Sequence, residues 1–178
     1  MPLSLDAVAE RARRIKLLLL DVDGVLTDGT IDVDYTAGES KRFYIRDGAA
    51  LVWARQAGLE IGLLSGRASG ATTRRAEELG IRLVSQGGTN KGDEYARILE
   101  QNGVDDAAVA YMGDDLLDLP VLVRAGLSAA PADAAQEVLA RVHWVSAHRG
   151  GHGAVREFIE LLLRATGHWD RLVSDHLT

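Results

Sequence analysis

The chain has 178 residues, a net charge of −6 and no cysteine. This length suits one domain, spanning 1–178, with a core that needs neither disulfides nor a structural metal. The missing thiols exclude a disulfide framework, a thiolate metal site and a cysteine nucleophile, and an acidic balance without a basic block argues against a nucleic-acid partner.

The segment 11–20 (RARRIKLLLL) has the charge of a signal peptide. Its apolar run is too short, however, and it leads into aspartates instead of a cleavage site. We therefore expect a cytoplasmic protein with no membrane partner.

Apolar runs of strand length alternate with segments of helical periodicity, after a short amphipathic helix that starts near Leu5. The strands are predicted at 16–22, 60–64, 82–85, 108–112, 127–129 and 143–145. The helices are predicted at 48–56, 71–79, 91–101, 116–124, 134–140 and 154–166. This alternation predicts an α/β fold, a Rossmann-like parallel sheet with helices on both faces, in which ligands bind beyond the carboxyl ends of the strands.

The segment from Thr30 to Arg46 departs from this alternation and predicts an inserted β-hairpin after the first strand. Its turn is placed at Ala37-Gly38, and its apolar side at Ile31, Val33, Tyr35, Phe43 and Ile45. A two-stranded hairpin alone is only marginally stable in water. We therefore expect its apolar face to be covered, and a second subunit is a plausible cover.

Four predicted strands end in polar motifs: DVDGVLT, LLSGR, QGGTNK and YMGDDLLD. Because the carboxyl ends of parallel strands lie on one edge, these motifs are expected to meet there. Each motif alone has a simpler explanation. The alternatives are turn residues for Asp21, Asp23 and Ser65-Gly66, a solvated side chain for Lys91, and helix caps or an exposed helical residue for Asp114, Asp115 and Asp118.

The conjunction of these motifs predicts phosphoryl transfer. Asp21 would attack phosphorus to form an aspartyl phosphate, while Ser65 and Lys91 hold the phosphoryl oxygens. Asp23 would protonate the leaving oxygen and then deprotonate the attacking water. Ligands that are all oxygen favour Mg²⁺, held by Asp21, Asp114 and the backbone carbonyl of Asp23.

The order of DVDGVLT, LSGR, Lys91 and GDDLLD resembles that of the haloacid dehalogenase superfamily. More narrowly, from about 16 to 167 the chain resembles the 3-deoxy-D-manno-octulosonate 8-phosphate phosphatase family, through FYIRDG, AGLSAAPADA and GGHGAVRE. The resemblance implies a capless, magnesium-dependent phosphatase that acts on a small sugar acid phosphate and yields free Kdo for lipopolysaccharide. It also implies a homotetramer in which the hairpin associates with its copies and a neighbouring subunit closes the site.

The resemblance implies the same roles for Asp21, Asp23, Asp114, Ser65 and Lys91. It adds Gly66 and Arg67 to the phosphate or substrate contacts, and Asp115 and Asp118 to the surroundings of the metal. The glycine-rich segment Arg149 to Arg156 is implied in substrate contact or closure, with a flexible turn as the simpler explanation.

Three alternatives remain open from the sequence. The substrate could be a related nine-carbon sugar acid phosphate. The chain could instead be a phosphoacceptor signalling domain, although such domains are shorter and carry the phosphoacceptor on a later strand. A catalytically silent regulatory subunit is the third, and the costly acidic cluster argues against it. Neither a P-loop nor a dinucleotide-binding glycine motif follows the first strand.

Overall fold

Six parallel strands form the central sheet in the order β5-β4-β1-β6-β7-β8. The computed structural model describes residues 2–33, 39–88 and 90–177. The strands are β1 (Leu17–Leu20), β4 (Glu60–Ser65), β5 (Leu83–Gln86), β6 (Val109–Met112), β7 (Leu127–Ala130) and β8 (Trp144–Val145). Leu20 at the end of β1 is paired with Leu63 on β4 and Met112 on β6, so the residues that follow β1, β4 and β6 emerge together at one edge.

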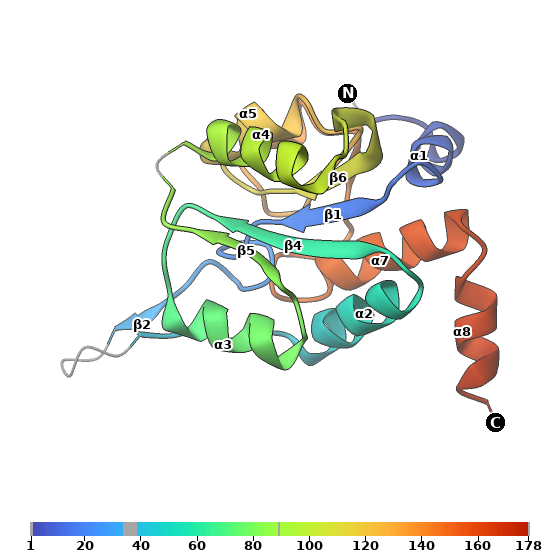
Figure 1. Cartoon of the computed structure of the whole chain (residues 1–178), viewed down its shortest axis with the longest axis horizontal. Helices are drawn as coiled ribbons and strands as arrows, with labels where there is room; N and C mark the ends of the chain where they lie inside the picture. Colours follow the sequence, from blue (N-terminus) through green and yellow to red (C-terminus); the bar gives the residue numbers. More distant parts are fainter. Residues whose placement is uncertain (1, 34–38, 89, 178) are drawn as a thin grey trace.

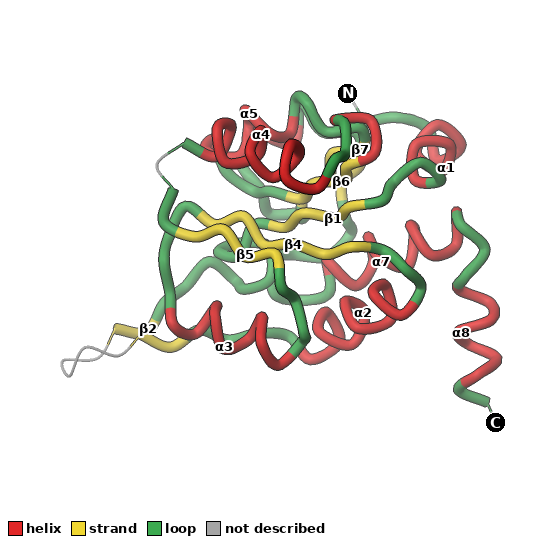
Figure 2. The backbone as a smooth tube through the Cα atoms, in the orientation of Figure 1, coloured by secondary structure: helices red, strands yellow, loops and turns green. Residues whose placement is uncertain are grey.

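Helices cover both faces of the sheet (Figures 1 and 2). One face is covered by α1 (Leu5–Ala12), α2 (Ile45–Gln56), α3 (Gly70–Glu78) and α7 (Ala154–Ala165). The other face is covered by α4 (Lys91–Asn102), α5 (Leu119–Leu122) and α6 (Gln136–Leu139). The leucines of β1 alternate between the two core clusters, which explains why the strand is apolar at every position. No helix within the described ranges is long and apolar enough to cross a bilayer.

The predicted strands and the α/β fold are confirmed, with ends that differ by a few residues. The continuous helix predicted at 116–124 is wrong. Asp115 caps a short 3-10 helix η2 (Leu116–Asp118), and α5 follows with Pro120 in its first turn. Proline is tolerated there because the first helical amides have no partner within the helix. A second 3-10 helix, η1 (Asp106–Ala108), precedes β6.

The tail, for which no element is predicted from the sequence, forms α8 (Trp169–Asp175). Trp169 is buried in the core, and its ring meets that of Trp53 edge to face. Tertiary packing of one aromatic side chain thus stabilises a helix too short to be stable alone.

The inserted hairpin after β1 is confirmed, but it is shorter than predicted. Strands β2 (Asp32–Val33) and β3 (Glu39–Ser40) pair antiparallel, while Tyr35 and the predicted turn at Ala37-Gly38 lie outside the described residues. The predicted second arm through Phe43 and Ile45 is wrong. Phe43 packs against the core, and Ile45 is the first residue of α2, with 80 % of its surface exposed. The alternating pattern here does not correspond to a strand, since α2 starts at Ile45 and not at residue 48, where its apolar periodicity predicts the start.

Candidate active site

The polar motifs meet at the carboxyl edge of the sheet, as predicted. They line a cavity of about 580 Å³. All nine predicted site residues belong to its lining: Asp21, Asp23, Ser65, Gly66, Arg67, Lys91, Asp114, Asp115 and Asp118. Asp21 follows β1, Ser65 ends β4, Lys91 begins α4, and the acidic set follows β6. Parallel strand register therefore explains why residues far apart in the sequence share one site.

Lys91 connects two carboxylates at the base of the cavity. Its Nζ lies 2.7 Å from Asp21 Oδ1 and 2.6 Å from Asp118 Oδ1, and all three side chains are buried. Burial alone would lower the pKa of Lys91, but the charges of Asp21 and Asp118 raise it above the ordinary value. Lys91 is therefore a fixed cation, and the simpler explanation of a solvated lysine is wrong.

Asp118 is buried, and its carboxylate holds the loop after β6 together. The simpler explanation, that Asp118 is an exposed helical residue, is therefore wrong. Its carboxylate accepts hydrogen bonds from Lys91 Nζ, from Tyr111 Oη at 2.5 Å, and from the backbone N–H groups of Asp114 and Asp115 at 2.9 and 3.1 Å. A Cβ atom at Gly113 would lie 2.5 Å from Asp118 Cγ, so the glycine of GDDLLD allows this close approach.

Asp115 matches the simpler explanation offered for it. Its Oδ1 accepts a hydrogen bond from the Leu116 N–H at 2.7 Å and caps η2, and Asp118 completes a capping box. The capping residue still lines the cavity, so its carboxylate contributes to the negative potential of the site.

A divalent cation fits the acidic cluster. Carboxylate oxygens of Asp21, Asp114 and Asp118 all lie within 4.8 Å of one another. Asp114 Oδ1 is buried, with no hydrogen-bond partner among the described residues. Burial, and then the charges of Asp21 and Asp118, raise the pKa of Asp114 to about 8. An oxygen-liganded cation such as Mg²⁺ would relieve this repulsion and occupy the free oxygen.

Asp21 shows the same crowding. Burial, and then Asp118, raise its pKa to about 6, although Lys91 opposes the shift. Gly24 of the DVDG motif also contributes to the cluster, because a Cβ atom there would lie 2.0 Å from Asp114 Oδ2 and its φ is +91°. The glycine thus lets the first loop approach the acidic residue that follows β6.

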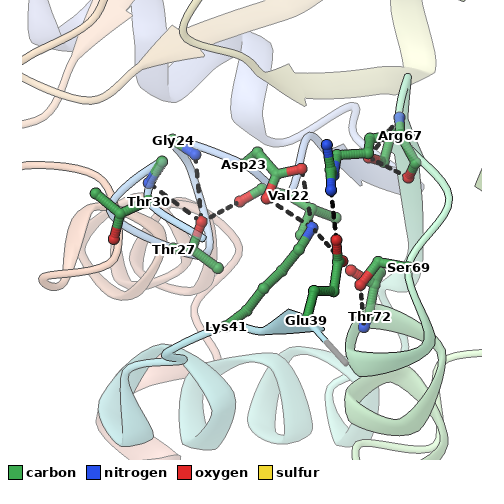
Figure 3. A network of polar contacts seen from close by, with 12 residues as sticks. Val22, Asp23, Gly24, Thr27, Thr30, Glu39, Lys41, Arg67, Ser69 and Thr72 are labelled. Carbon is green, nitrogen blue, oxygen red and sulfur yellow. Dashed lines mark hydrogen bonds and ion pairs between the residues drawn. The ribbon is translucent and has the colours of Figure 1, made fainter. Parts of the chain in front are cut away.

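The carboxylate of Asp23 lies outside this cluster and is bound from the hairpin side (Figure 3). Lys41 Nζ lies 2.7 Å from Asp23 Oδ1 and 2.9 Å from Oδ2. This leaves the backbone carbonyl of Asp23 as the group predicted to reach the metal. Lys41 was not predicted as a site residue. The rarity of lysine in this chain was the available signal, since lysine occurs at 16, 41 and 91 alone.

The turn after β4 is stabilised by hydrogen bonds of Ser65 and also lines the cavity. Ser65 Oγ donates to the Arg67 carbonyl at 3.0 Å and accepts from the Arg67 N–H at 3.3 Å, as expected for a turn-forming serine. A Cβ atom at Gly66 would lie 3.8 Å from the Lys91 side chain, which places this turn beside the buried lysine. The guanidinium of Arg67 is half-exposed and forms an ion pair with Glu39 on β3.

The glycine-rich segment 149–156 lies against the loop after β1. A Cβ atom at Gly150 would lie 1.7 Å from the Gly24 carbonyl oxygen, and the Gly151 N–H donates to the Val25 carbonyl at 2.9 Å. Asp47 of FYIRDG accepts from the Arg156 N–H at 2.8 Å and so holds the first turn of α7. The segment supports the loop that carries Asp23, and its part in substrate contact stays a prediction.

The sheet has an aspartate pair after its first strand, a serine at the end of the second, a lysine at the start of the helix that follows the third, and an acidic set after the fourth. This arrangement defines a haloacid dehalogenase-like hydrolase. A family model with that description matches residues 80–159. The 3-deoxy-D-manno-octulosonate 8-phosphate phosphatase KdsC of Escherichia coli K12 is 41 % identical over 169 residues, which cover 95 % of this chain and 89 % of that protein. The chain therefore belongs to the 3-deoxy-D-manno-octulosonate 8-phosphate phosphatase family.

Two solved structures agree with this assignment. The phosphatase of the same name from Moraxella catarrhalis, in complex with a magnesium ion, a phosphate ion and a KDO molecule, is 34 % identical. It superposes with a TM-score of 0.94 over 96 % of this chain and 98 % of its own. The Yersinia pestis phosphatase is 38 % identical, with a TM-score of 0.91 over 93 % of this chain and 89 % of its own.

Proposed function

We propose that this protein is a magnesium-dependent phosphatase that hydrolyses 3-deoxy-D-manno-octulosonate 8-phosphate to Kdo and phosphate. One observation carries the proposal: buried Lys91 lies between Asp21 and Asp118, beside the unpartnered oxygen of Asp114, at the edge of the sheet where substrates bind. The similarity to phosphatases of this substrate, over nearly the whole chain, supports the choice of sugar.

The proposed reaction has two steps. In the first, Asp21 forms a bond to phosphorus while the bond to the sugar oxygen breaks, and Asp23 gives that oxygen a proton. In the second, Asp23 removes a proton from water as the water attacks phosphorus and releases Asp21. Lys91 and the Ser65 turn bind the phosphoryl oxygens in both steps.

Mg²⁺ bound by Asp21, Asp114 and the backbone carbonyl of Asp23 would offset the negative charge of these groups and of the incoming phosphate. Asp118 has another task in this proposal. It holds Lys91 and the loop after β6 in place, because its two oxygens already accept hydrogen bonds from both.

Closure of the site by a second subunit, in a homotetramer, belongs to the proposal. Val33 on β2 and Ile45 at the start of α2 are 76 % and 80 % exposed, and Leu117 at the cavity is also exposed. Apolar residues exposed around an open site support such an association. A single domain over 1–178 and a cytoplasmic location stay predictions.

A phosphate-release assay over a panel of sugar acid phosphates tests this function. With Mg²⁺, Kdo 8-phosphate should give the highest kcat/KM of the panel, and EDTA should abolish turnover until Mg²⁺ is restored. A nine-carbon sugar acid phosphate is the decisive competitor, since a higher kcat/KM for that ester would reassign the substrate. Full turnover after thorough chelation would contradict the metal requirement.

A further inference from the structure

Lys41, which follows β3, has a completely buried side chain. Its ammonium group contacts both carboxylate oxygens of Asp23, at 2.7 and 2.9 Å, and lies 3.9 Å from Glu39. Figure 3 shows the lysine extending from the hairpin to a point between these two acids. A side chain of the inserted hairpin thus reaches the residue proposed as acid and base.

Burial of this lysine has a cost that packing alone does not explain. A buried ammonium group loses its hydration, and only paired charges offset that loss. Methionine, an unbranched apolar side chain, could fill the same space without the penalty. The presence of lysine is therefore explained by what its Nζ contacts.

Asp23 needs such a contact because the groups on which it is proposed to act, the leaving oxygen and the attacking water, are not fixed to the protein. About a quarter of its side chain (26 %) is exposed, in contrast to buried Asp21. Proton transfer requires the acid to lie within hydrogen-bond reach of the leaving oxygen, in one orientation. An ammonium group has donors only, so it can bind an oxygen of Asp23 whether that carboxyl group is protonated or ionised.

We propose that Lys41 is a positioning residue that orients Asp23 for proton transfer to the leaving oxygen. The proposal rests on the function proposed above for Asp23. It also connects the hairpin to the chemistry, because Glu39, two residues before Lys41, binds Arg67, which lines the cavity together with Asp23. The hairpin would then hold Asp23 and Arg67 in fixed positions relative to each other.

The test compares two leaving groups in single turnovers with enzyme in excess and Mg²⁺ present. Sugar release from Kdo 8-phosphate needs a proton, whereas nitrophenolate leaves p-nitrophenyl phosphate without one. Lys41→Met should slow sugar release by about 30- to 100-fold, part of the 10² to 10⁴ that a general acid contributes. It should slow nitrophenolate release by less than about threefold, and substrate affinity should change little.

Two further variants complete the comparison. Lys41→Arg keeps a cation and should recover most of the sugar release, while Lys16→Met makes the same substitution at an exposed lysine before β1 and should match the wild type. Equal losses for both leaving groups, or no loss for either, would overturn the proposal. If Lys41→Met does not fold by circular dichroism, Lys41→Gln provides the same comparison.

A double variant separates this proposal from the function on which it rests. If Lys41 acts through Asp23, adding Lys41→Met to Asp23→Asn should cause little further loss of sugar release. Independent, multiplicative losses would overturn the positioning role. Undiminished sugar release by Asp23→Asn alone would instead show that the acid role of Asp23 is wrong, which also removes the basis of the positioning role.

Discussion

The two acidic residues of the DVD motif lie in different surroundings. Asp21 belongs to a buried network with Lys91 and Asp118. Asp21 follows β1, Lys91 begins α4, and Asp118 lies in the loop after β6. Asp23 is partly exposed and is bound by Lys41 from the inserted hairpin. The sheet therefore holds the proposed nucleophile, while the insertion contacts the proposed acid and base.

The largest expected effect falls on the network of Asp21. Asp21→Asn should reduce turnover of Kdo 8-phosphate by about 10⁴-fold or more, because the nearly isosteric amide cannot attack phosphorus. The melting temperature should not fall, since the amide still accepts a hydrogen bond from Lys91 and one buried charge is removed. Steady-state kinetics and thermal melting measure the two halves. Persistent turnover by a pure sample would contradict the assignment of Asp21.

Lys91→Met should affect both activity and stability. It leaves Asp21 and Asp118 buried without their shared cation, a change that typically costs about 3 to 5 kcal/mol of unfolding free energy. Loss of a phosphoryl-oxygen ligand should lower kcat/KM by about 10²-fold or more. Urea unfolding and kinetics provide the measurements, with Lys16→Met as the matched control. Stability equal to that of the control would show that the two carboxylates do not depend on this lysine.

Val33→Glu tests the contribution of the hairpin. Val33 is 76 % exposed in the single chain, so the charge should leave the fold intact. If a second subunit closes the site there, the charge should dissociate the oligomer and lower kcat/KM by about tenfold through loss of orientation. Light scattering and kinetics test this result, and Val173→Glu on α8 is the control. A wild-type monomer at micromolar concentration, or a dissociated variant with full turnover, would exclude closure by assembly.

Glu39→Gln should have the smallest effect. It removes the charge that binds Arg67, whose side chain is half-exposed, and exposed ion pairs contribute little. We expect KM to rise by about threefold, with kcat unchanged, because Arg67 keeps its place in the turn through backbone contacts with Ser65. Initial rates over a range of substrate concentrations measure this. A large fall in kcat would show that Glu39 takes part in the chemistry.

The same contrast explains what the sequence could predict. The sequence could predict that Asp21, Ser65, Lys91 and Asp114 lie at one edge of the sheet, because the alternation of strands and helices determines where parallel strands end. The simpler explanations for Lys91 and Asp118 failed because both residues are buried by a contact across the fold, between α4 and the loop after β6, and no local periodicity shows such a contact.

The hairpin and the tail were harder to predict. Ile45 continues an alternating pattern but begins a helix, and α2 packs on α7, a tertiary contact that local alternation does not show. Lys41 has the appearance of a surface residue on a short strand until the fold brings it to Asp23. Helix α8 depends on burial of Trp169, which is a tertiary contact.

Identifying the residue that carries the phosphoryl group tests the proposed mechanism directly. Asp23→Asn removes the proposed base of the second step, while p-nitrophenyl phosphate needs no acid in the first, so acid-quenched reactions of this variant with p-nitrophenyl phosphate and Mg²⁺ should accumulate a phosphoenzyme. Peptide mass spectrometry should place the phosphoryl group on Asp21. A phosphoryl group on another residue, or stoichiometric phosphate release in the burst with no modified peptide, would contradict nucleophilic attack by Asp21.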